Sequence, residues 1–351
     1  MFKISSNKKL SRVLTLFVIT ALFTGLLSFA SYGESAGNKG TSAVQAEQNG
    51  WEKTLDRHRL LSAAYGNNAY VAVGEDGVIK TSSDGQNWSV SHSTGMALRS
   101  VVFGKGKFVA VGNLGQILTS PNGREWNPVT SGTEKNLTGI AFNGTKFAAV
   151  GDRGTLLVSE NGTAWSRIVP DKEYSLSEIA SGDGTFITTH KDTFNSILVS
   201  EDGADWNPVE PVTDLYGYGN PSYNGETFLM TAKIPHQDGT AMVASKDGKV
   251  WTRVENAPKV NAVASGGAGF IALGDAARDE NNILTQKIYT SADGRNWTAG
   301  SVKWDGGSYS ELMFVKYLNN EWIGFSLHGE IYSSENGVNW TREGREPVCR
   351  L

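Results

Sequence analysis

The sequence contains a single cysteine, Cys349, close to its C-terminal end. One thiol cannot form an intramolecular disulfide, so the core alone must hold the fold. The few histidines are scattered without the local spacing of metal ligands: His58, His92, His190, His236 and His328. Phosphate-cradling loops, nucleotide fingerprints and nucleophile-elbow motifs are missing as well. We therefore expect no cofactor and no metal site, with calcium bound by acidic loops left as an open alternative.

Long apolar runs are equally scarce, because the only one is residues 13–30. Lys3, Lys8, Lys9 and Arg12 precede it, and it ends in the small-residue pattern Ser-Phe-Ala at 28–30. This pattern predicts a signal peptide over 1–30, with an uncleaved anchor as the alternative. Residues 31–50 are small and polar, which is typical of a flexible linker. The expected product is secreted or extracytoplasmic, with no integral membrane segment in the mature chain.

Basic residues are outnumbered by acidic ones. The whole chain has a formal net charge of −4, and removing residues 1–30 leaves 28 basic and 36 acidic residues, a balance of −8. An acidic surface disfavours nucleic acid and anionic membranes as ligands. The partners we expect are a polysaccharide or an extracytoplasmic protein, and the protein is expected to be a monomer.

What the sequence has in abundance is one short string, Ser-x-Asp/Asn-Gly-x-x-Trp, which occurs seven times. The tryptophans that end the copies are Trp88, Trp126, Trp165, Trp206, Trp251, Trp297 and Trp340. Successive tryptophans are 38 to 46 residues apart, a period that is typical of propeller blades.

Each repeat also contains four short runs rich in β-branched residues, separated by Gly and Asn turn signals. The sequence therefore predicts an all-β protein: a single seven-bladed β-propeller of four-stranded antiparallel blades over residues 51–351. The first strands are expected to begin near Leu60, Leu98, Leu137, Leu176, Tyr218, Val260 and Tyr309. Trp51 is left over, and its strand is expected to complete the last blade and close the ring.

The repeated string has the chemistry of a tight turn between the third and fourth strands. Its Asp or Asn side chain can accept backbone N–H groups, and its Gly can adopt a positive φ. The tryptophan supplies an apolar plate for packing between blades. We interpret the string as structural in all copies, with turn residues Asp84, Asn122, Asn161, Asp202, Asp247, Asp293 and Asn336.

These strings resemble the Asp-box, or BNR, repeat of bacterial sialidases, other glycan-active propellers and photosystem assembly factors of the Ycf48 type. The resemblance covers nearly all of residues 51–344, although the familiar box has one residue more between Asp and Trp. It implies a propeller fold, but the arginine motif that sialidases carry ahead of their first box is missing here. No sialidase catalytic residue is therefore carried over.

Binding residues are expected on the face opposite the boxes, where the loops between second and third strands and the links between blades vary most. The candidates combine aromatic rings, imidazoles and charged groups, a mixture that suits sugar binding: His190, Asp192, Tyr216, Tyr218, His236, Asp275, Arg278, Trp304 and His328. Ordinary solvated loops and rings buried between blades are the alternative. Four carboxylates could face a common axial funnel, although the repeat alone accounts for their spacing and it does not indicate catalysis: Asp152, Asp192, Asp275 and Glu330.

Three functions remain open on this basis. The first is an exported, non-catalytic propeller that presents its loop face to a polysaccharide or protein partner. The second is a glycoside hydrolase or polysaccharide lyase acting on an extracellular glycan, and the third is an assembly factor like Ycf48. Because one scaffold carries many unrelated activities, the fold cannot rank them.

Overall fold

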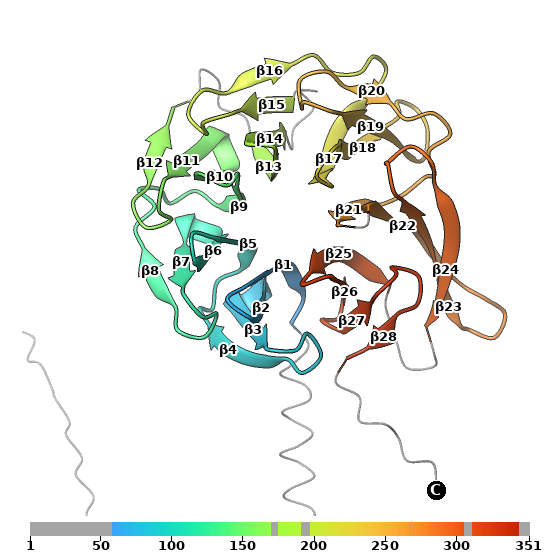
Figure 1. Ribbon diagram of the computed structural model, residues 1–351, viewed down its shortest axis with the longest axis horizontal. Helices are drawn as coiled ribbons and strands as arrows, with labels where there is room; N and C mark the ends of the chain where they lie inside the picture. The colour runs from blue at the N-terminus through green and yellow to red at the C-terminus, as the bar shows by residue number, and fades with distance from the viewer. Residues whose placement is uncertain (1–57, 170–174, 191–196, 268, 305–310, 344–351) are drawn as a thin grey trace, which may run out of the picture. The chain divides into compact units, whose positions relative to one another are not determined.

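The computed structural model describes residues 58–169, 175–190, 197–267, 269–304 and 311–343. Within them the chain forms seven four-stranded antiparallel sheets, each built from consecutive strands and arranged as blades around a central axis (Figure 1). The expected all-β, seven-bladed propeller is confirmed. No helix among these residues has the length and apolar character needed to cross a membrane. The expected signal peptide, the linker and Trp51 lie outside the described residues.

The blades follow one another in chain order. Blades 1 to 4 contain β1 (Leu60–Gly66), β2 (Ala69–Gly74), β3 (Val78–Ser82), β4 (Ser89–Ser93); β5 (Leu98–Gly104), β6 (Lys107–Gly112), β7 (Ile117–Ser120), β8 (Asn127–Val129); β9 (Leu137–Phe142), β10 (Phe147–Gly151), β11 (Thr155–Ser159), β12 (Ser166–Ile168); β13 (Leu176–Gly182), β14 (Thr185–His190), β15 (Ile197–Ser200) and β16 (Asn207–Val209). Blades 5 to 7 contain β17 (Tyr216–Tyr223), β18 (Phe228–Lys233), β19 (Thr240–Ser245), β20 (Thr252–Arg253); β21 (Ala262–Gly266), β22 (Gly269–Arg278), β23 (Leu284–Ser291), β24 (Thr298–Trp304); β25 (Leu312–Leu318), β26 (Glu321–Ser326), β27 (Ile331–Ser334) and β28 (Thr341–Arg342). Short 3₁₀ turns join the second and third strands of blades 1 to 3: η1 (Glu75–Gly77), η2 (Asn113–Gly115) and η3 (Asp152–Gly154).

In blades 1 to 4 the first strand begins at the predicted residue. In blade 5 the strand begins at Tyr216, two residues earlier than expected, and its register shifts on both sides of Gly219. In blade 6 it begins at Ala262, two residues later than expected, and in blade 7 at Leu312. All four strands of the seventh sheet come from the segment between Leu312 and Arg342.

Each of the seven repeated strings, called a box from here on, forms the same turn with the same hydrogen bonds. In the second, the Ser120 hydroxyl accepts a hydrogen bond from the Gly123 amide at 2.8 Å. Asn122 Oδ1 accepts hydrogen bonds from the amides of Arg124 and Glu125 at 2.9 and 3.0 Å. The indole Nε1 of Trp126 donates to the Gly123 carbonyl at 2.9 Å. The string therefore caps its own turn, as its residue types predict.

A buried aromatic ring lies across the sheet from the box serine in each blade. Tyr70 is paired with Ser82 in blade 1, and Phe108 with Ser120 in blade 2. The corresponding residues of the later blades are Phe147, Phe186, Phe228, Phe270 and Trp322. All seven are almost completely buried, so these rings form a belt through the cores of the blades.

The box glycine also sets how closely two blades approach. Gly123 has φ of +75°, and a Cβ placed on it would lie 2.5 Å from Val71 Cγ2 of the preceding blade. Gly162 packs in the same way on Val109, and Gly248 on Ile187. The missing side chain therefore serves two purposes, because it permits the left-handed backbone and leaves room for the neighbouring blade.

Side-chain packing between blades 7 and 1 closes the ring. Leu60 and Tyr70 of blade 1 share a buried cluster with Ile323 and Phe325 of blade 7. The Asn319 side-chain amide donates to the Tyr70 hydroxyl at 2.9 Å. Hairpin asparagines of blades 1, 3 and 5 likewise reach carbonyl groups of the next blade.

Proline occupies the middle of two outermost strands, β8 and β16. Pro128 and Pro208 are each paired with a residue of the third strand. Because proline has no N–H, its nitrogen offers no donor at the outer edge of the blade. These edges are therefore poor templates for pairing with another chain.

The dual role of the box glycine can be tested with two alanine variants at nearly identical φ angles. Gly132 has φ of +74° but no atom within 4 Å of an added Cβ, so Gly132→Ala should cost only the ~1–2 kcal/mol of a left-handed residue. Gly123→Ala adds the clash with Val71 and should cost a further ~1–3 kcal/mol. Urea unfolding measures both, and equal losses would contradict the close-approach role.

The box carboxylates should make the free energy of unfolding depend on pH in the acid range. In the folded state, amide hydrogen bonds, chiefly from the residue three positions on, hold the pKa values of Asp202 and Asp247 below 3.8. Their stabilisation is present above the unfolded pKa and is lost as the pH falls below it. Asparagine makes the same acceptor contacts in blades 2, 3 and 7 without titrating.

The double variant Asp202→Asn/Asp247→Asn should therefore stay folded and lose less stability than the native protein between pH 7 and pH 3. As the matched reverse change, Asn122→Asp should lose more. Thermal unfolding followed across this pH range measures both effects. Identical pH profiles for all three proteins would show that the box carboxylates do not contribute to acid unfolding.

Candidate functional site

Several residues predicted for the binding face are buried in the structure. Tyr218 is 4% exposed, and its hydroxyl accepts the Val212 amide at 2.9 Å. Trp304 is 5% exposed and packs against Tyr332, with ring centroids 4.7 Å apart. His190 is also buried, at the end of β14. Because these rings are covered by the blades, they offer no surface for stacking on a sugar.

The other predicted residues are exposed, except for Asp192, which lies outside the described residues. Tyr216, at the start of β17, is 37% exposed, and Asp275 accepts the Asn261 side-chain amide at 3.3 Å. The exposed set also includes His236, Arg278 and His328. None of these lines the central channel described below, and the structure does not gather them into one cavity.

The long loop expected after Gly274 is largely a β-ribbon. Strands β22 and β23 pair as far as Arg278 and Leu284. The turn between them is closed by Asp279, whose Oδ1 accepts the amides of Asn281 and Ile283 at 2.9 Å. The sequence predicted a long, individual loop between the second and third strands of this blade, and hydrogen bonds along the ribbon fix most of that segment.

The carboxylates expected in an axial funnel also separate. Glu330 forms an ion pair with Arg342 at 2.8 Å, and Arg342 belongs to β28, the outermost strand of blade 7. Glu330 is therefore directed into its own blade. Asp152, in η3, accepts the Asn136 side-chain amide at 2.9 Å. Asp152 and Glu330 are therefore engaged by separate partners and are not paired across a common bond, as glycosidase chemistry requires, and Asp192 lies outside the described residues.

The innermost strands of the blades surround the central axis (Figure 1). A channel of about 430 Å³ lies among them and is lined mainly by their residues. Its charged residues are Arg59, Arg99, Glu178 and Lys316, so the lining has three positive groups and one negative group. The sequence argument missed this set. The available signal was a charged residue in an innermost strand that is otherwise apolar or small, as in Leu-Met-Phe-Val-Lys-Tyr-Leu at 312–318.

Two of the channel cations contact residues of the loop face, the face of the ring that contains the turns between second and third strands. Arg99 Nε donates to Asn113 Oδ1 at 2.7 Å, and Arg59 forms an ion pair with Glu75 at 3.6 Å. Asn220, with φ of +52°, donates its backbone N–H to a Glu178 carboxylate oxygen. These contacts connect the channel wall to the turns above it.

Glu178 and Lys316 affect each other's protonation. Both side chains contact water, but protein surrounds them within the channel. Enclosure raises the pKa of Glu178, while the Asn220 amide and the charge of Lys316 oppose this effect. Enclosure also lowers the pKa of Lys316, and the carboxylate of Glu178 opposes it. The channel is therefore a partly desolvated environment, in which charges interact more strongly than on an open surface.

Most of the exposed large apolar side chains lie on the loop-face side of the ring. Eight large hydrophobic residues are exposed in the described part of the chain. Five of them lie in turns, links or strand starts of the loop-face side: Met96, Leu114, Tyr216, Met313 and Leu327. Met313 also lines the channel. The five residues are spread around the ring, from the link before blade 2 to blade 7, and exposed apolar side chains on one face favour the binding of a partner.

The groups around the channel have the chemistry of a binding surface. Within the described ranges, no group of three or more His, Cys, Asp or Glu residues is placed to hold a metal ion. The channel lining contains one carboxylate, Glu178. Apolar side chains beside a positively charged channel can instead hold a ligand that has both apolar and anionic groups.

Fold and site together define a seven-bladed β-propeller with a loop face and a charged central channel. No family model matches the sequence, and no curated protein matches it. Solved structures share the fold: a Ycf48 bound to a D1 peptide has a TM-score of 0.57 and 13% identity, over 81% of this chain and 93% of that one. Ycf48 from Cyanidioschyzon merolae has a TM-score of 0.55 and 16% identity, over 79% and 95%.

The fold is also similar to that of glycoside hydrolases. An ancestral GH74 enzyme has a TM-score of 0.60 and 14% identity, and the match covers 83% of this chain but 47% of the enzyme. The GH74 xyloglucanase from Xanthomonas campestris has a TM-score of 0.53 and 13% identity, over 80% and 52%. At these identities the similarity establishes the fold alone.

The coupling in the channel can be measured through the titration of one carboxyl group. Lys316→Met should raise the pKa of Glu178 further, because it removes the positive charge that opposes the effect of enclosure. Carbon-detected NMR of the Glu178 carboxyl gives the value directly. Lys287→Met, at an exposed lysine of β23, should leave it unchanged. An unaltered Glu178 titration in Lys316→Met would contradict the coupling.

Proposed function

We propose that the protein is an exported, non-catalytic propeller that binds an extended, acidic segment of a partner protein on its loop face. The observation that carries this proposal is the coincidence of exposed apolar side chains with a positively charged channel on the same side of the ring. Apolar contacts would provide much of the affinity, and the cations would select a negatively charged segment.

The charge of the channel is opposite to that of the molecule. The chain has a net charge of −4, whereas the lining of the channel has three cations to one carboxylate. An acidic segment would be repelled by most of the surface and attracted to the channel mouth. This contrast favours one binding position over non-specific adsorption.

A polysaccharide is less well supported as the partner. Sugar-binding sites use exposed rings, and of the predicted rings Tyr218 and Trp304 are buried while Tyr216 is exposed. The similarity to a Ycf48 bound to a D1 peptide supports a peptide ligand only as an analogy between folds. Export rests on the leader predicted over residues 1–30.

The proposal can be tested with residues 31–351 and an array of synthetic peptides that differ in acidic and apolar content. Peptides that combine Asp or Glu with apolar residues should bind, and their affinity should fall as salt is raised. Leu114→Asp on the loop face and Arg99→Ala in the channel should each weaken binding about tenfold or more. Val90→Asp, at an exposed residue of β4, is the control and should bind normally.

Two results would overturn the proposal. One is equal binding by Leu114→Asp, Arg99→Ala and Val90→Asp, which would place the ligand elsewhere on the molecule. The other is the appearance of shortened or unsaturated products when the protein is incubated with soluble and cell-wall polysaccharides. Such products would identify a glycoside hydrolase or a polysaccharide lyase.

A further inference from the structure

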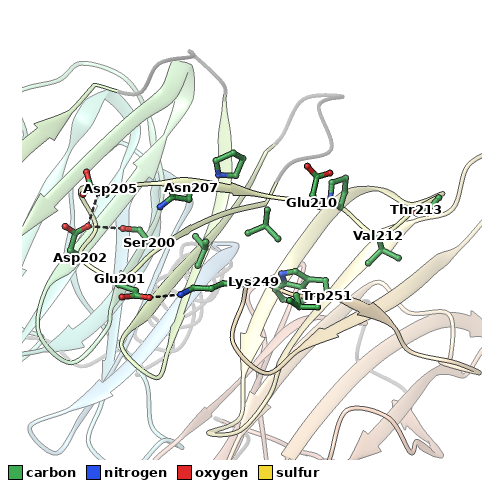
Figure 2. A pocket seen from close by; sticks show the side chains of 15 residues that line it. Ser200, Glu201, Asp202, Asp205, Asn207, Glu210, Val212, Thr213, Lys249 and Trp251 are labelled. Atoms are coloured by element: carbon green, nitrogen blue, oxygen red, sulfur yellow. Dashed lines mark hydrogen bonds and ion pairs between the residues drawn. The ribbon is translucent and has the colours of Figure 1, made fainter.

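A second surface lies at the perimeter of the ring, between blades 4 and 5. Here a groove of about 1040 Å³, which we call the rim groove, separates two walls. One wall is the end of blade 4, from Val199 through β16 to Thr213, and the other is Lys249–Trp251 of the blade 5 box. Figure 2 shows residues of both walls, with Lys249 of blade 5 reaching across to Glu201 of blade 4.

The floor of the rim groove is apolar. Val199, Val209 and Trp251 contribute buried side chains. The indole Nε1 of Trp251 donates a hydrogen bond to the Gly248 carbonyl at 2.8 Å. At the lip, Val250 is 68% exposed. The residues at the equivalent position before the tryptophan of the other boxes are Asn87, Glu125, Ala164, Asp205, Asn296 and Asn339. The fifth box therefore exposes a branched apolar side chain where the others have a polar residue or alanine.

Carboxylates surround this floor. The lining contains Glu201, Asp202, Asp205 and Glu210 against one cation, Lys249, which gives a local balance of −3. Lys249 donates to Glu201 at 2.8 Å, and Asp202 is engaged by its own turn. Among the residues that the structure describes, Asp205 and Glu210 make no ion pair and are exposed.

The edge strand limits how a ligand can be held. Pro208 lies in the middle of β16, whose residues pair with β15 on the inner side. Since proline has no N–H, a guest strand cannot extend the hydrogen-bond ladder of blade 4 at this residue. Recognition in the rim groove must therefore come mainly from side chains.

An extended peptide fits these constraints, because its successive side chains point to opposite sides. One row can contact the valines and Trp251 on the floor, while the other reaches the carboxylates at the rim. A basic side chain can also replace Lys249 at Glu201, since that pair is exposed to water.

We propose that the rim groove is a second docking site, and that its occupant is an extended segment of a partner protein with alternating basic and apolar side chains. This site is distinct in position and in charge from the acidic-segment site of the loop face. The propeller would then hold two segments of opposite charge at once, one on the loop face and one at the perimeter.

The test uses two labelled twelve-residue peptides with residues 31–351 of the protein: one alternates Arg with Val, and the other has Glu in place of Arg. The Arg–Val peptide should bind in fluorescence anisotropy, and the Glu–Val peptide should not. Binding should shift the indole N–H signal of Trp251 in the NMR spectrum, which is assigned with Trp251→Phe. A shift confined to other tryptophans would overturn the proposal.

Matched variants separate the groove from the general acidity of the surface. Asp205→Lys should weaken binding of the Arg–Val peptide about tenfold or more, whereas Glu125→Lys, at the same position of the second box, should not. Val250→Asp should remove the apolar contact at the lip, with Val90→Asp as its control. Equal effects of Asp205→Lys and Glu125→Lys would show adsorption to charge alone.

The loop-face variant Leu114→Asp keeps the two proposals apart. It should leave the binding of the Arg–Val peptide unchanged while reducing that of acidic peptides. Loss of both activities in this variant would mean that the two peptides share one site, and the rim groove would not be a separate docking surface.

Discussion

The ring depends on the close approach of each box turn to the blade before it. The box glycines of blades 2, 3, 4, 5 and 7 lie directly against side chains of the preceding blade, such as Val71 under Gly123 and Ile271 under Gly337. A side chain at these positions would push adjacent blades apart. Because the seven blades close into one ring, a wider spacing between two of them would have to be accommodated at the other contacts between blades. This explains why the turn is repeated with so little variation.

Much of this architecture was accessible from the sequence, for a physical reason. The Ser, Asx, Gly and Trp of each box share the hydrogen bonds that close their own turn, so their roles in that turn can be deduced from residue types and spacing. The number of blades and most strand starts follow from that repeat. The aromatic belt, from Tyr70 to Trp322, was less visible because it depends on pairing across the sheet with the box serine.

The functional surfaces were harder to predict, because they depend on which side chains the closed ring leaves exposed. For Tyr218 and Trp304 the sequence left open both a surface position and burial between blades, and in the structure both rings are buried. Glu330 looked axial, and its pairing with Arg342 turns it toward the perimeter. Arg99, Glu178 and Lys316 are far apart in the chain, and only ring closure brings them around one channel. No local pattern contains this information.

The prolines in β8 and β16 have a consequence for how such a protein could have grown from its repeat. Duplicating a blade multiplies outer edges, and each unprotected edge can recruit a strand from another molecule. A proline carried within the Asn-Pro-Val run, at 127–129 and again at 207–209, is copied together with the blade that it protects. Resistance to fibre formation can in this way be inherited with the repeat itself.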